Sequence, residues 1–114
     1  MIYPDDETRH AYHKTPLLLQ VVCQMLESEL SAYHLQLELV DCEEQEKFWV
    51  ALLVAGNEHF EDSPHMQHGL KQAVASLNAK FTRYDGKPTA SVEQGNYGLV
   101  TVRVTDSKAF KQLQ

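Results

Sequence analysis

Three histidines, His59, His65 and His68, lie within ten residues of one another, where the pattern predicts a loop followed by a helix start. Positions three apart share a face of a helix, so His65 and His68 could bind one ion, with His59 added from the loop. Imidazole ligands suit Zn²⁺ or Ni²⁺. The spacing matches no specific zinc signature. A metal-dependent enzyme or metal sensor at these histidines is therefore an alternative hypothesis, and otherwise we expect no cofactor.

Five carboxylates gather at the end of an expected strand and in the turn that follows it: Glu38, Asp41, Glu43, Glu44 and Glu46. Paired acids can perform general acid–base catalysis, but only in a cleft that shifts their pKa values. A hairpin tip is usually exposed, so the simplest interpretation is a solvated charge cluster. An exposed acidic tip can also bind a basic groove. We therefore predict these five residues as a partner-binding surface.

Motifs for nucleophilic catalysis and nucleotide binding do not occur in the chain. There is no G-x-S-x-G, no G-x-G-x-x-G and no P-loop. Cys23 and Cys42 show no C-x-x-C spacing, so we expect reduced thiols. We predict no catalytic residues, and a non-enzymatic role is favoured.

The net charge of −6 is distributed unevenly. Residues 1–62 carry thirteen Asp and Glu against three Lys and Arg, a net charge of −10, whereas residues 63–114 carry +4. Binding to phosphates depends on cationic contacts, so direct nucleic-acid binding is not expected of the acidic half. No apolar run approaches the roughly 20 residues that span a bilayer. The acidic N-terminus lacks the features of a secretory signal, which predicts a cytoplasmic location and no membrane partner.

Residues 1–14 show no sustained hydrophobic periodicity and are expected to form an N-terminal arm. Thr15-Pro16 resembles a helix start, with Thr15 as N-cap. The apolar spacing from Leu17 predicts an amphipathic helix to about Tyr33. Residues 34–41 alternate as a half-buried strand does.

Residues 42–55 are ambiguous. The acidic residues within 41–44 would suit the first turn of a helix, and Gly56 would suit its C-terminal end. Phe48 to Val54 is instead rich in aromatic and β-branched residues and apolar on all sides, as in a central strand. A hairpin closed through 42–46 is the favoured interpretation, and a helix over 42–55 is the alternative.

The second half of the chain repeats this order. Ser63-Pro64 predicts the start of a helix that ends near Arg83, followed by a hairpin of 89–93 and 97–104 and a short helix over 108–113. The prediction is an α+β fold of two helix-hairpin units (α-β-β-α-β-β plus a short C-terminal helix). A four-stranded, mainly antiparallel sheet carries the helices on one face. Residues 1–14 are the arm and 15–114 a single domain.

The leading functional hypothesis follows from the charge distribution. It is a non-enzymatic, acidic protein–protein interaction module, inhibitor-like or chaperone-like, that binds a basic partner through its N-terminal half. A third hypothesis is a self-associating structural subunit, such as a homodimer, in which an exposed strand edge pairs across a two-fold axis.

Overall fold

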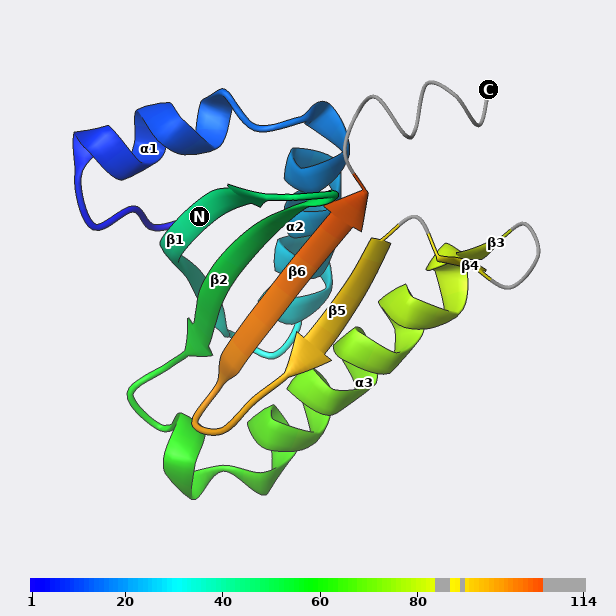
Figure 1. Cartoon of the computed structure of the whole chain (residues 1–114). Helices are drawn as coiled ribbons and strands as arrows, with labels where there is room; N and C mark the ends of the chain where they lie inside the picture. Colours follow the sequence, from blue (N-terminus) through cyan, green and yellow to red (C-terminus); the bar gives the residue numbers. More distant parts are fainter. Residues whose placement is uncertain (84–86, 89, 106–114) are drawn as a thin grey trace.

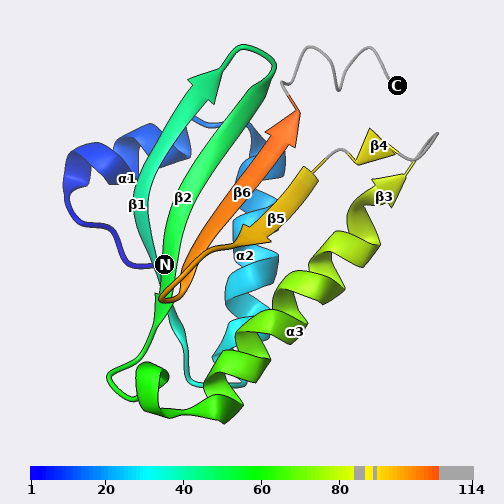
Figure 2. The same cartoon turned by 60° about the horizontal axis from the view of Figure 1, so that its bottom comes forward.

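The computed structural model describes residues 1–83, 87–88 and 90–105, and it has an α+β architecture. A four-stranded antiparallel sheet has the order β1-β2-β6-β5, and α2 and α3 lie on the same side of it (Figures 1 and 2). The main elements are α1 (Asp6–His13), α2 (Leu17–Ser31), β1 (Gln36–Gln45), β2 (Phe48–Gly56), α3 (Pro64–Phe81), β5 (Ala90–Gln94) and β6 (Leu99–Thr105). Shorter elements are η1 (Phe60–Asp62), β3 (Thr82–Arg83) and β4 (Lys87–Pro88).

The ambiguous segment completes a hairpin, but its residues 42–45, predicted as part of the connecting loop, instead extend the first strand. β1 continues to Gln45 and β2 begins at Phe48, with a two-residue turn between them. Alternate residues of β2 are buried under the helices, and the segment pairs with β1 on one side and β6 on the other. The helical alternative for 42–55 is therefore wrong, because a run that is apolar on every side here fills the centre of the sheet.

The core lies between the sheet and the two long helices. Each long helix buries one apolar stripe, and the covered sheet face is made of small and branched apolar residues. The stripe of α3 is the predicted one, whereas that of α2 is turned from its predicted position, with Leu19 and Cys23 fully buried and Val21 40% exposed. The largest fully buried side chains are Leu19, Leu26, Leu30, Leu37, Leu39, Leu53, Leu70 and Leu77. Truncating one of these leucines to Ala would cost about 2–5 kcal/mol.

The two predicted helix starts have different outcomes. At α3 the Met66 N–H donates to Ser63 Oγ at 3.2 Å, so Ser63 lies in the predicted capping position. Thr15 does not cap α2, which begins at Leu17 after Pro16 without a side-chain cap. The Thr15 hydroxyl and N–H both donate to Tyr12 O at the end of α1. The prediction for Thr15 is wrong because α1 ends at His13, and Thr15 bonds a carbonyl at the end of that helix instead of capping α2.

The N-terminal residues pack against the rest of the chain. Ile2 forms a parallel bridge with Glu38 of β1, and the Tyr12 side chain of α1 is buried in the core. Asp5 caps α1 by accepting from the Thr8 N–H at 2.7 Å, and this hydrogen bond lowers the pKa of Asp5. The sequence pattern did not reveal α1, whose eight residues bury mainly Tyr12.

Other boundaries shift slightly. α3 ends at Phe81, two residues before the predicted end, and Thr82–Arg83 pairs with Lys87–Pro88. The predicted helix over 108–113 lies outside the described residues. Among the helices that the structure describes, none combines the length and the apolar character needed to cross a membrane.

Candidate functional site

One face of the sheet, the open face, is not covered by α2 or α3. Residues directly opposite each other in an antiparallel pair point to the same side of the sheet. Ala51, Leu53 and Ala55 of β2 are fully buried on the helix side, so the alternate residues of β2 point to the open face. These residues form an apolar row: Phe48, Val50, Leu52 and Val54.

The partners of the apolar row on β1 are mostly acidic. Val54 lies opposite Glu38, Leu52 opposite Asp41, and Val50 opposite Glu43. These three glutamate and aspartate residues, the acidic row, are exposed along the edge strand of the sheet. The open face thus has carboxylates directly beside apolar side chains.

A β-bulge creates this alignment. Leu37 and Leu39 point into the core, and simple alternation would place Asp41 and Glu43 on the same covered side. The register shifts between Leu39 and Asp41, so one residue, Val40, is inserted. After the bulge Asp41 and Glu43 face the open side, and Cys42 instead packs against the core.

On the other side of the apolar row lies β6. Leu99, Thr101 and Arg103 lie opposite Val54, Leu52 and Val50. The Arg103 guanidinium lies over the Phe48 ring, 5.9 Å from its centroid, a cation–π arrangement. Arg103 is thus a cationic group on this face, and Glu93 of β5, which lies opposite Thr101, adds a further carboxylate to it.

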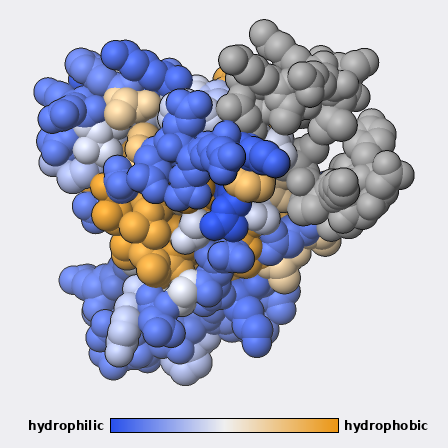
Figure 3. Space-filling model, viewed as in Figure 1, coloured by the Kyte–Doolittle hydropathy of each residue, from blue (hydrophilic) through white to orange (hydrophobic). Residues whose placement is uncertain are grey.

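The open face is partly hydrophobic at its surface. Phe48 is 39% exposed, and Ile2 and Val40, which lie at the β1 edge, are 44% and 45% exposed. Figure 3 shows hydrophobic residues gathered over the β1–β2 part of the sheet, bordered by hydrophilic ones. An exposed apolar patch with a polar rim is typical of a protein-binding surface.

The structure divides the predicted acidic cluster. Glu38, Asp41 and Glu43 lie together on the open face, whereas Glu44 lies opposite Trp49 on the other side of the sheet. Glu46 lies in the turn between β1 and β2. The sequence identified the segment, but the division depends on the bulge.

The predicted histidine cluster does not come together. The ring of His65 lies 5.2 Å from that of Tyr33, and His68 Nε2 lies 3.3 Å from Gln72 Nε2. His59 Nε2 lies 3.3 Å from Glu58 Oε1 at the surface. Across residues 1–83, 87–88 and 90–105, no group of three or more His, Cys, Asp and Glu side chains could hold a metal ion. Metal binding by His59, His65 and His68 stays a prediction without support from this geometry.

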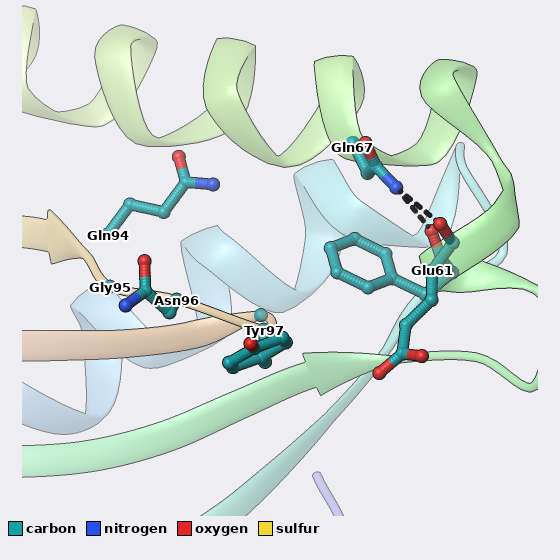
Figure 4. Close-up of a pocket in the computed structure, with 8 residues that line it drawn as sticks. Glu61, Gln67, Gln94, Gly95, Asn96 and Tyr97 are labelled. Carbon is teal, nitrogen blue, oxygen red and sulfur yellow. Dashed lines mark hydrogen bonds between the residues drawn. The ribbon is translucent and has the colours of Figure 1, made fainter.

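A cleft of about 390 Å³ lies beside the turn between β5 and β6 (Figure 4). Tyr97 in this turn is 84% exposed and has a positive φ of 57°, a conformation uncommon for a residue other than glycine. Across the cleft, the Gln67 side chain donates to the Phe60 and Glu61 carbonyls at 3.0 Å each. An exposed tyrosine beside amide groups can contact a protein partner. Sequence reasoning did not identify this cleft, because its walls come from separate segments.

Neither cysteine is an activated nucleophile. Both thiols are free. Burial raises the pKa of Cys23 to about 12, and burial together with the Asp41 charge raises the pKa of Cys42. A raised pKa lowers the thiolate fraction at neutral pH, which argues against covalent catalysis by either residue.

Compared with known proteins, the chain matches no family model, no curated protein and no solved structure.

Proposed function

We propose that the protein is a non-enzymatic binding module that holds a basic protein partner on the open face of its sheet. The observation that carries the proposal is the alignment of the acidic row directly beside the apolar row. Apolar contact supplies affinity, and the carboxylates attract and orient a cationic partner. A complementary partner would present aliphatic or aromatic side chains flanked by Lys or Arg.

Binding fits this face better than catalysis. The side chains of Glu38, Asp41 and Glu43 are exposed on the sheet surface, whereas acid–base catalysis needs groups held in a cleft that alters their pKa values. The acidic N-terminal half of the chain adds a long-range field of the same sign. An inhibitor-like or chaperone-like role is the form of this function that we favour. We further propose a cytoplasmic location, consistent with the two free cysteines.

Charge reversal on the open face tests the proposal. The probe is an immobilised amphipathic peptide of Lys and Leu, and the readout is its association rate with the protein at two salt concentrations. Glu38→Lys combined with Glu43→Lys should slow association about tenfold at low salt and reduce the salt dependence. Glu58→Lys combined with Asp62→Lys is the matched control, because it changes the net charge equally and both exposed carboxylates lie in the segment between β2 and α3.

A second peptide separates specific binding from simple charge attraction. A Lys/Ser peptide of equal charge should bind at least about tenfold more weakly, because it cannot cover the apolar row. Equal binding of the two peptides, or equal effects of the open-face double reversal and of the control double reversal at Glu58 and Asp62, would contradict the proposal. Sedimentation of the protein alone reports self-association, in which case the occupant of the face would be a second copy.

A further inference from the structure

The two edges of the sheet are treated differently by the fold. At the β5 edge, the Asn78 side chain of α3 bonds both backbone groups of Val92: its amide donates to Val92 O at 2.7 Å, and its oxygen accepts from Val92 N–H at 2.8 Å. This pattern imitates a neighbouring strand. Edge strands that are covered in this way cannot pair with another chain at that position.

The β1 edge already accepts an extended segment over its first half. The Ile2 N–H donates to Leu37 O at 2.8 Å, and the Leu39 N–H donates to Ile2 O at 2.9 Å. The bridge between Ile2 and Glu38 is parallel. This part of β1 therefore pairs on both sides, as a central strand does.

The second half of β1, after the bulge, has backbone groups that point away from β2. In an antiparallel ladder, residues that bond the neighbour alternate with residues that face outward. Gln45 and Phe48 close a two-residue turn and form a bonded pair, so Glu44 and Cys42 face outward. The Cys42 N–H donates to Asp41 Oδ1 at 2.9 Å, which agrees with this direction. Within the described part of the chain, no strand other than β2 pairs with residues 41–45.

We infer that the partner adds an extended segment to this edge, as a strand beside residues Asp41–Gln45. The inference rests on the proposed function and specifies how that partner is bound. The Glu44 N–H, Glu44 C=O and Cys42 C=O supply the backbone hydrogen bonds. This mode of recognition, strand addition, takes affinity from the backbone and specificity from alternate side chains.

Side-chain charge selects the kind of strand. Residues of an added strand directly opposite Asp41 and Glu43 point to the open face, with their Cβ atoms about 5 Å from those of Asp41 and Glu43. Lys or Arg at these alternate positions forms favourable cross-strand pairs. A second copy of β1 would bring carboxylates against carboxylates, which is unfavourable. The edge therefore favours a basic partner over self-pairing.

The test uses a peptide of about eight residues with alternating Lys and Val, long enough for one short strand. Its matched control carries an N-methyl group on every residue, which keeps every charge and side chain but removes all backbone N–H donors. The unmodified peptide should bind about tenfold more tightly and slow hydrogen exchange of the Glu44 amide.

A pair of protein variants tests the same edge from the other side. Glu44→Pro removes the outward N–H without removing a bond to β2, a position where edge strands tolerate proline. Glu44→Pro should weaken binding of the unmodified peptide about tenfold. Glu44→Gln removes the charge but keeps the N–H, and it should change affinity less than about threefold.

The outcomes separate the inference from the proposal beneath it. Equal binding of the two peptides, with a loss only in the Glu38→Lys, Glu43→Lys variant, would overturn strand addition and leave the open-face proposal standing. Absence of binding by either peptide, together with no binding of the Lys/Leu peptide, would overturn both. Slower exchange at Glu44 with the unmodified peptide alone would support the inference.

Discussion

Substituting Gly98 tests how the β5–β6 turn is held against the centre of the sheet. Gly98 has a φ of +81°, and a Cβ built on it would lie 2.2 Å from the backbone oxygen of Ala55. The Ala55 N–H also donates to Gly98 O at 2.8 Å. Because the severe contact is with a backbone oxygen, no flexible side chain can move aside to relieve it. Gly98→Ala should therefore displace the start of β6 from β2.

The magnitude follows from three effects. A left-handed conformation costs an alanine about 1–2 kcal/mol, and overpacking costs about 1–3 kcal/mol. Reduced freedom of the unfolded chain returns about 0.4–1 kcal/mol. We expect a net loss of about 1–4 kcal/mol in the free energy of unfolding, measured by urea denaturation with the slope unchanged.

Gly56→Ala is the matched control for this measurement. Gly56 ends β2, and a Cβ there would meet no atom within 4 Å. Its free energy of unfolding should change by less than about 1 kcal/mol. If Gly98→Ala were as stable as Gly56→Ala, the close approach of these two backbones would not be the constraint that positions Tyr97 and the adjacent cleft.

Two further predictions concern stability. Asn78→Ala should lower the free energy of unfolding by about 1–3 kcal/mol, because both hydrogen bonds of Asn78 to Val92 are lost. Light scattering should also report more aggregation, because the β5 edge is opened. Unchanged stability and unchanged scattering would contradict this role of Asn78. Burial raises the pKa of Cys23 from 9.0 to about 12. The protonated thiol therefore contributes fully to the free energy of unfolding below pH 9, and this contribution is lost as pH rises toward 12, at about 1 kcal/mol per pH unit. Cys23→Ala should flatten the decline of unfolding free energy between pH 9 and 11, and a slope equal to that of the unaltered protein would refute the assignment.

Local patterns were sufficient to predict α2, α3 and the hairpin of β5 and β6, but not α1. The apolar spacing of α2 and α3 and the alternation of Leu35, Leu37 and Leu39 directly reflect burial. The ambiguity over 42–55 arose because acids near a chain reversal suit a helix start as well as a turn, and pairing with β6 decided it.

Features that depend on long-range pairing were not predictable in the same way. The bulge at Val40 changes which side Asp41 and Glu43 occupy, and a one-residue shift in a strand moves every later side chain to the other face. The bonds of Asn78 to Val92 and of Ile2 to β1 join residues that no local pattern connects. The sequence therefore indicated an acidic segment, while its alignment with the apolar row required the structure.

The most direct measurement of the central claim is a methyl NMR titration with the amphipathic Lys/Leu peptide. We predict that the methyl resonances of Leu52 and Val54 on the open face shift with peptide concentration, and that added salt weakens the effect. Leu17, which is 74% exposed on α2, is the internal control and should not shift. Shifts at Leu17 without shifts at Leu52 and Val54 would contradict binding through the open face.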